Sequence, residues 1–291
     1  MTNGDDRKKR YLIATACNRK YENFLLNHWF RSLKDNVNLS DTDVLVMDFG
    51  LSEYVQRELS QNGVMVKKAI RTDGHINNMR FFELGDFLKE KPHYEQVILC
   101  DSGDLIFQSD ISDIFNLEPD KVKAVVEDVS FNFELLVDDD IVENADEIKK
   151  FLSGKQLVNM GFVVYPRDVF LNLVEKMGKI LKDPRKWGTD QAIINYFLLK
   201  MDFYKLEAKY NFNPTTTICK YIVDNGKFYL LEGRKKVLIP VVHNAGGVKI
   251  WRPILNFGYG LGYNKPRKIW IFVNRSFFRI TSALSRFFRR I

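Results

Sequence analysis

The sequence predicts an α/β fold, with a mostly parallel sheet flanked by helices, in a chain of 291 residues. Apolar runs typical of buried strands alternate with segments of helical periodicity over the first hundred residues, which indicates parallel strands joined by helical crossovers. One run ends in two acids, Asp101 and Asp104, with a glycine between them. Open α/β sheets bind ligands at the carboxyl ends of their strands, so we expect a site at this turn.

The first half of the chain supplies most of the predicted sheet. We expect strands at residues 11–17, 43–48, 64–66 and 97–100 because each is a short run of apolar residues. We expect helices at residues 20–34, 52–61 and 77–90, which lie between these runs. The regular alternation of the two element types is the main reason for predicting parallel strands.

The second half departs from this alternation. Strands are expected at residues 123–126, 158–165, 206–212 and 237–242, and helices at residues 168–182 and 188–200. A polar insertion that contains Asp138, Asp139 and Asp140 precedes the second of these strands. Three adjacent acids suggest a metal site, but a solvated loop is the simpler interpretation.

The cysteines and the amino-terminal residues bear on the cellular compartment. The three cysteines, Cys17, Cys100 and Cys219, are few, odd in number and far apart. They indicate neither a disulfide framework nor a thiolate metal site, and they favour a reducing cytoplasmic compartment. Residues 1–10 are charged and contain no apolar stretch, so no secretory signal is expected.

The positive charge of the chain is concentrated at its carboxyl end. The net charge is +7, and residues 265–291 contain eight Lys or Arg residues and no acid. Helical spacing of three and four aligns Trp270, Val273, Phe277, Ile280, Leu284, Phe287 and Ile291 in one apolar stripe. This pattern predicts a basic amphipathic helix, and no apolar run reaches the ~20 residues needed to span a bilayer.

A basic, aromatic-rich amphipathic helix is typical of segments that lie on an anionic membrane surface. We therefore expect a domain at residues 1–264 and a membrane-associating tail at residues 265–291, in a cytoplasmic protein held on the inner face of the membrane. The alternatives are a helix docked on the body or on a partner protein. Nucleic acid binding is not expected, because the body has no excess of basic residues.

The acid pair suggests chemistry on a phosphorylated substrate. Carboxylates a few residues apart can share a divalent cation, and Mg²⁺ or Mn²⁺ commonly bridges such ligands to phosphate oxygens. The alternative is a polar turn in which Asp101 or Asp104 caps the next element.

Later segments offer partners for this pair. His243, at a strand end, could be a third ligand through its neutral imidazole, or simply a buried histidine. Lys249 follows two glycines and could neutralise a diphosphate, or it could be a solvated lysine. Asp190 stands at a helix start, where it could serve the site or cap the helix.

Together these segments resemble glycosyltransferase family 8, the retaining enzymes of the glycogenin and lipooligosaccharide galactosyltransferase type, which have the Rossmann-like GT-A fold. The resemblance runs from about residue 11 to 255, and the late His-x-x-Gly-x-x-Lys-x-Trp motif is its most specific part. The matching residues are Ala16, Asn18 and Tyr21; Asp101, Asp104 and Asp110-Ile111; Asn159 and Gly161; Asp190 and Gln191; and His243, Gly246, Lys249 and Trp251. The chain departs from the family pattern in its longer D-x-x-D spacing, in Asn18 and Ala192 where the family has acids, and in Ile250 where it has proline.

The resemblance implies specific roles for these residues. It implies that Asp101, Asp104 and His243 hold Mn²⁺ or Mg²⁺ against the diphosphate of a nucleotide sugar. The residues implied to bind the donor are Ala16, Asn18, Tyr21, Arg80, Gly246 and Lys249, and those implied to face the sugar and the acceptor are Asn159, Asp190 and Gln191.

The function implied is transfer of a hexose from a nucleotide sugar, with UDP as the expected nucleotide, and with retention of configuration. With the basic tail, the acceptor expected is a membrane-associated glycan or glycolipid such as lipopolysaccharide core. Two alternatives are a sugar-phosphate nucleotidyltransferase and a non-catalytic membrane-bound scaffold on a degenerate GT-A fold. An inverting transferase is the nearest rival within the same class of enzyme, and it would need a general base near the acceptor.

Overall fold

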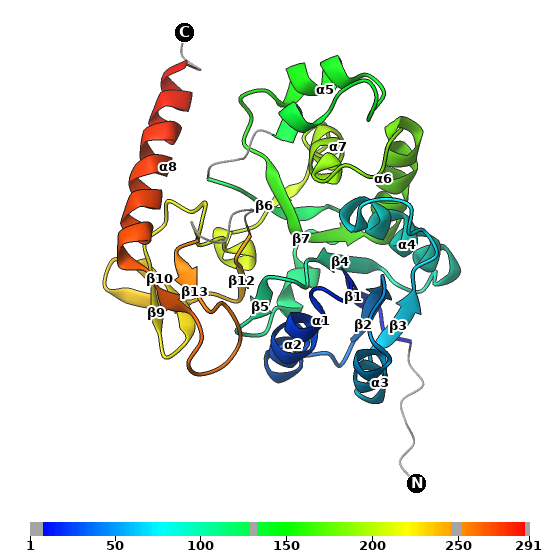
Figure 1. Cartoon of the computed structure of the whole chain (residues 1–291), viewed down its shortest axis with the longest axis horizontal. Helices are drawn as coiled ribbons and strands as arrows, with labels where there is room; N and C mark the ends of the chain where they lie inside the picture. Colours follow the sequence, from blue (N-terminus) through cyan, green and yellow to red (C-terminus); the bar gives the residue numbers. More distant parts are fainter. Residues whose placement is uncertain (1–7, 129–132, 246–251, 289–291) are drawn as a thin grey trace.

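The computed structural model describes residues 8–128, 133–245 and 252–288. A seven-stranded sheet forms its centre (Figure 1). In spatial order its strands are β3 (Met65–Lys68), β2 (Thr42–Asp48), β1 (Tyr11–Cys17), β4 (Gln96–Cys100), β7 (Val158–Pro166), β6 (Lys123–Val126) and β8 (Tyr204–Lys205). Only β7 runs against its neighbours, so the prediction of a mostly parallel sheet is confirmed.

Helices cover both faces of the sheet and bury its apolar side chains in two cores. One face packs against α4 (Ile76–Glu90), α5 (Ala145–Leu152), α6 (Arg167–Ile180) and α7 (Thr189–Leu198). The other packs against α1 (Glu22–Phe24), the π-helical turn η1 (Leu25–Phe30), α2 (Arg31–Asn36), α3 (Glu53–Gln61) and the 3₁₀ turn η2 (Ser112–Asn116). Another 3₁₀ turn, η3 (Phe133–Leu136), precedes α5. The expected helix at residues 20–34 thus forms as an α-helical turn, a π-helical segment and a second α-helical segment in succession.

The carboxyl-terminal third builds smaller sheets beside the central one. These contain β9 (Tyr221–Asp224), β10 (Lys227–Glu232) and β11 (Lys235–Leu238); β5 (Leu105–Phe107) with β12 (Val241–His243); and β13 (Ile254–Leu255) with β14 (Lys265–Pro266). The turn between β9 and β10 is Asn225-Gly226, and both residues have positive φ. Asn-Gly is a strong hairpin signal, so the sequence did contain the evidence for this missed hairpin.

Two predicted strands are corrected by the structure. Residues 206–212 are not a strand, because a 3₁₀ turn, η4 (Ala208–Asn211), redirects the chain from β8 toward β12. Residues 237–242 form two strands that belong to different sheets. The break falls at Pro240, which has no N–H to donate to a continuous ladder.

The final helix, α8 (Lys268–Phe288), lies beside the β9–β10 hairpin, and its carboxyl end points away from the body (Figure 1). Beside the two cores of the central sheet, a third hydrophobic cluster is formed by Ile106, Phe212, Tyr221, Phe228, Ile239, Val242 and Ile254. Ile271 packs against this cluster, and the Arg275 guanidinium carbon lies 5.6 Å from the centre of the Tyr221 ring. Arg275 is half-buried there. The early turns of the helix are therefore docked.

The outer side of α8 is apolar and exposed. The exposed side chains are Ile269, Phe272, Val273, Phe277 and Ile280, and all but Phe272 follow one another at steps of four, four and three residues. Val273, Phe277 and Ile280 belong to the predicted stripe. Within the described ranges, none of the helices combines the length and the hydropathy that a membrane crossing requires.

Candidate metal and donor site

The site forms where strands distant in sequence end at the same edge of the molecule. β4 delivers Asp101, whose backbone N–H donates to the Gly161 carbonyl of β7. The chain turns after Asp101 and enters β5, which pairs antiparallel with β12. In this pairing His243 is opposite Leu105, and the Asn244 N–H donates to the Asp104 carbonyl over 2.7 Å. The β5–β12 ladder therefore brings the late histidine to the early acids.

The three predicted metal ligands converge. Nε2 of His243 lies 3.4 Å from Asp101 Oδ2 and 3.3 Å from Asp104 Oδ1. One ligand atom from each residue can be chosen so that all lie within 4.8 Å of one another. The extra residue of the D-x-x-D spacing is thus absorbed by the turn, and both carboxylates reach the imidazole.

The chemistry of this cluster suits a divalent cation. His243 is buried, and its Nε2 makes no well-aligned hydrogen bond among the described residues. Its Nδ1 lies 3.0 Å from Asn211 Oδ1, so the ring can donate on that side and leave Nε2 free as a ligand. Two carboxylates and one imidazole are suitable ligands for Mn²⁺ or Mg²⁺.

The carboxylates also control the charge of the metal-free histidine. Burial alone disfavours the imidazolium, but the neighbouring Asp104 and Asp101 outweigh it and raise the pKa of His243 to about 10. Cation binding at Nε2 therefore has to displace a proton.

Gly161 leaves room for the histidine. A Cβ on Gly161 would lie 2.0 Å from His243 Cε1 and 2.6 Å from its Nδ1. Any side chain at this position would collide with the imidazole, so the glycine of the Asn159-Met160-Gly161 segment is needed for the site to close.

Arg80 is buried behind the metal cluster. Its Nη1 pairs with Asp101 Oδ1, and its Nη2 lies 3.5 Å from Asp190 Oδ2. Burial alone would lower the pKa of Arg80, but Asp101 and Asp190 reverse the effect and raise it. Arg80 and His243 in turn hold the pKa of Asp101 well below its usual range, although burial opposes them. Asp190 is thus linked to the cluster through one guanidinium.

Gln191 and Asn159 lie beside this group, and both are held by hydrogen bonds. The Gln191 amide donates to the Val158 carbonyl and accepts from Met160 N–H over 3.2 Å, so it pairs with the backbone of β7. Asn159 Oδ1 accepts from Gly161 N–H over 2.8 Å, and its Nδ2 donates to Glu127 over 3.1 Å.

The residues expected to bind the donor base stand at the end of β1. The Ala16 carbonyl accepts from Ser102 Oγ, which ties the end of β1 to the acid-bearing turn. Asn18 Oδ1 accepts from Lys20 N–H. The Tyr21 ring is partly exposed, and a Cβ on Gly103 would be 3.0 Å from it. A partly exposed aromatic ring, with the Lys20 Nζ 5.1 Å from its centre, therefore lies directly beside the acid pair.

Gly246 and Lys249, like Trp251, lie outside the described residues. The nearest described residue beyond them is Arg252, whose Nη2 lies 3.6 Å from Asp104 Oδ2. A cationic side chain at this edge of the cluster is suited to an anionic ligand.

Sequence reasoning missed two buried polar residues at this site, Asn211 and Glu127. Asn211 lies in the segment predicted as a strand, where its side chain had no evident role. Glu127 directly follows β6, and burial raises the pKa of its carboxyl group despite hydrogen bonds from Asn159 and Asn213. The rule that selected Asp101, an acid immediately after an apolar strand, would also have found Glu127.

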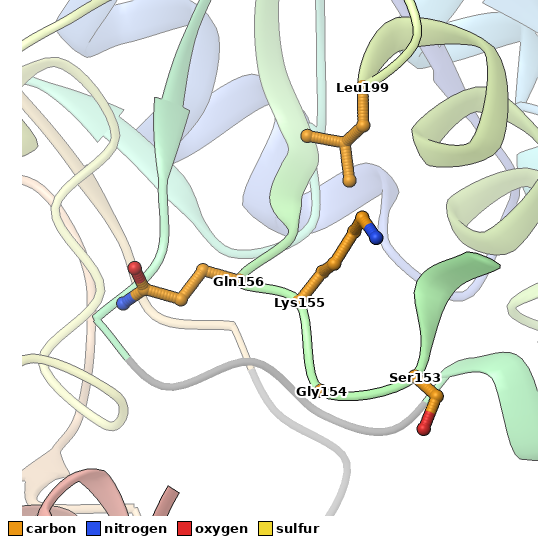
Figure 2. A pocket seen from close by; sticks show the side chains of 5 residues that line it. All are labelled: Ser153, Gly154, Lys155, Gln156 and Leu199. Atoms are coloured by element: carbon orange, nitrogen blue, oxygen red, sulfur yellow. The ribbon is translucent and has the colours of Figure 1, made fainter. Parts of the chain in front are cut away.

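A separate open hollow lies at the end of α5. It is lined by Ser153, Gly154, Lys155, Gln156 and Leu199 (Figure 2). None of the predicted site residues lines it, so it is distinct from the metal cluster.

The fold and the cluster together define an α/β protein with a site able to hold a divalent cation. The sequence matches the model of glycosyl transferase family 8 over residues 34–254. Since this match covers most of the chain, the protein belongs to that family. A search of curated proteins gave no match.

Solved structures of glycosyltransferases share the fold. The apo structure of the bifunctional glycosyltransferase WbbM superposes with a TM-score of 0.56 at 17% identity, over 85% of this chain and 48% of that one. GlyE from Streptococcus pneumoniae TIGR4 gives a TM-score of 0.53 at 18% identity, over 95% and 64% of the two chains. The chain thus spans about half of WbbM and less than two thirds of GlyE.

Proposed function

We propose that this protein is a metal-dependent, retaining glycosyltransferase that moves a hexose from a nucleotide sugar, with UDP as the nucleotide, to a membrane-associated glycan. The observation that carries the proposal is the convergence of Asp101, Asp104 and a buried His243 Nε2 that has no aligned hydrogen-bond partner within the described part of the chain. Retention of configuration rests on membership of the family.

The residues of the cluster would bind the cation and keep the ligands charged. Asp101, Asp104 and His243 would hold Mn²⁺ or Mg²⁺, and the ion when bound would act as a Lewis acid on the diphosphate leaving group. Arg80 orients Asp101 and keeps it ionised. Arg252, Gly246 and Lys249 are proposed to contact the diphosphate.

The remaining residues would position the two sugars and the base. Tyr21 offers an aromatic face for the base at the end of β1, with Ala16 and Asn18 in the adjoining turn. Asp190, Gln191 and Asn159 are proposed to face the transferred sugar and the acceptor. Their hydrogen bonds to β7 and to Arg80 would hold them in place as the donor binds.

The donor and the metal can be tested together. A panel of nucleotide sugars is incubated with the chain and Mn²⁺, and release of nucleoside diphosphate is measured. Asp101→Ala should abolish metal-dependent release, whereas Asp113→Ala, which changes an exposed acid on η2, should leave it unchanged. Equal activity of Asp101→Ala and the unaltered chain would refute the proposal.

The same samples separate the alternatives. A nucleotidyltransferase would release pyrophosphate from a nucleoside triphosphate and a sugar phosphate. A non-catalytic scaffold would bind neither UDP nor Mn²⁺ in a calorimetric titration. An inverting enzyme would give the opposite product anomer by NMR.

For the acceptor, we propose a glycan at a membrane, such as lipopolysaccharide core, with residues 1–264 as the catalytic domain and residues 265–291 as a membrane-associating tail. The exposed apolar row of α8 and the basic residues of the tail support this. The protein would then be cytoplasmic and peripheral on the inner face of the membrane.

Vesicle flotation tests the tail in the full chain. The double variant Phe272→Ser, Phe277→Ser removes two exposed rings, each worth about 1.5–3 kcal/mol when buried in lipid. We expect at least about 100-fold weaker binding to anionic vesicles. Tyr54→Ser, which removes an exposed ring on α3, is the matched control. Unchanged flotation of the double variant would contradict the proposed surface.

A further inference from the structure

A chain of hydrogen bonds connects Glu127 to the metal-facing histidine. Glu127 Oε1 accepts from Asn159 Nδ2 over 3.1 Å. Asn159 Oδ1 accepts from Asn211 Nδ2 over 3.4 Å, and Asn211 Oδ1 lies 3.0 Å from His243 Nδ1. The chain crosses from the end of β6 to β7, then to η4 and β12. It therefore ties together segments that are far apart in the sequence.

The direction of each bond is determined by its surroundings. Glu127 Oε1 also receives donors from Asn213 and Thr216, so it acts only as an acceptor. A flipped Asn159 amide would place its oxygen against this carboxylate and its NH₂ against the Gly161 N–H, which now donates to Oδ1. Asn159 must therefore present its oxygen toward Asn211.

The same reasoning determines the orientation of the Asn211 side-chain amide. Its Nδ2 faces two acceptors, the Asn159 carbonyl oxygen at 3.2 Å and the Asn159 Oδ1. If the Asn211 amide were flipped, its side-chain oxygen would face these two Asn159 oxygens with no hydrogen between them. Asn211 Oδ1 is consequently turned toward His243, and the only group on that side of the ring that can satisfy it is an Nδ1–H.

We propose that Glu127, Asn159 and Asn211 form a positioning relay that fixes the orientation and tautomer of His243. With Nδ1–H held by Asn211, Nε2 is the ring nitrogen directed at Asp101 and Asp104, and a cation bound there would displace the Nε2 proton and leave the Nδ1–H in place. The relay rests on the proposed metal-dependent function, and it gives Asn159 a role in ordering the metal site in addition to facing the sugar. Histidine ligands to metals ordinarily need such a partner on their second nitrogen.

The hydrogen bond itself can be tested without metal. In the metal-free chain labelled with ¹⁵N-histidine, the Nδ1–H of His243 should exchange slowly with solvent, and His243→Gln assigns its signal among the four histidines. Asn211→Leu should abolish the protection. A signal that exchanges as fast in the unaltered chain as in Asn211→Leu would overturn the relay.

The consequence for metal binding is measured by calorimetry with Mn²⁺ alone. Removal of an outer partner typically weakens metal binding 10- to 100-fold, and we expect this loss in Asn211→Leu. Glu127→Leu should lose roughly 10-fold. Glu127→Gln keeps an oxygen for Asn159 and should stay within about 3-fold of the unaltered chain, because the geometry of the relay survives.

A matched control separates the relay from general damage. Thr216→Val removes a neighbouring contact to the same Glu127 oxygen without interrupting the relay, and it should leave Mn²⁺ affinity unchanged. Thermal melting shows whether each variant is folded. If Asn211→Leu does not fold, the comparison of Mn²⁺ affinity between Glu127→Gln and Glu127→Leu tests the relay instead. Equal losses in Glu127→Gln and Glu127→Leu would mean that charge alone acts, and would overturn the relay.

The outcomes also distinguish this proposal from the proposed function. Failure of the unaltered chain to bind Mn²⁺ would refute the metal-dependent function. Normal Mn²⁺ binding by Asn211→Leu and Glu127→Leu would leave that function standing and refute the relay.

Discussion

The space left by Gly161 provides the sharpest test of the site. In Gly161→Ala the new methyl group would lie 2.0 Å from His243 Cε1, whereas ordinary van der Waals contact begins at 3.4 Å. It would also lie 2.9 Å from Asn159 Oδ1. The backbone at Gly161 is fixed by β7 pairing and by the bond from Asp101 N–H, so the imidazole is the group that must move.

The size of the effect follows from that displacement. The ring has to retreat by roughly 1 Å or more, and misplacement on this scale costs on the order of 100-fold in rate. We therefore expect Gly161→Ala to lower kcat/KM by at least about 100-fold, or about 2.7 kcal/mol of transition-state stabilisation. Overpacking should also lower the free energy of unfolding by about 1–3 kcal/mol.

The assay measures nucleoside diphosphate release, Mn²⁺ affinity and thermal stability on the same preparation. The matched control is Gly178→Ala in α6, where the added Cβ would only touch Phe82 at 3.4 Å. Alanine is a better helix former than glycine, so this control should gain up to about 1 kcal/mol and keep full activity. A folded Gly161→Ala protein with unchanged activity and Mn²⁺ affinity would refute the assigned role of His243.

Two further predictions concern buried charges away from the imidazole. Burial lowers the pKa of Lys123 to about 8, so the charged amine penalises the fold fully below pH 8 and not at all above its ordinary pKa of 10.5. The stability of the unaltered chain relative to Lys123→Met should therefore rise by about 3 kcal/mol between these limits, and a flat difference in urea unfolding would contradict this. Arg80→Leu should cost about 3–5 kcal/mol by stranding Asp190 and Asp101, whereas Arg185→Leu, which breaks an exposed pair, should change the stability far less. A loss in Arg80→Leu no larger than in the control would show that the buried pair contributes little.

The sheet was predictable because its strands are local, continuous apolar runs. Residues 11–17 and 97–100 are buried almost throughout, and their sequences show it directly. The acid pair could be found for the same reason, since it follows one of these strands without a gap. The turn at η4 was missed because burial of Tyr210 and Phe212 resembles strand alternation, although the chain bends between them.

The meeting of the acids with His243 could not be derived from any local pattern. It depends on the β5–β12 ladder, whose strands have only three residues each and lie far apart in the sequence. The resemblance to glycosyltransferase family 8 predicted that His243 meets the acids, whereas the spacing of apolar residues could not predict it. The contacts of Asn211 and Glu127 are of the same long-range kind, and only the folded structure reveals them.

The late position of β12 affects how the protein becomes active during synthesis. A nascent chain that has produced β4 and β5 already carries both acids, yet it lacks the imidazole that completes the ligand set. The cation site therefore forms only after the segment around His243 has emerged and docked along β5. Prematurely terminated chains would carry the two carboxylates without the third ligand, so they would lack a complete cation site.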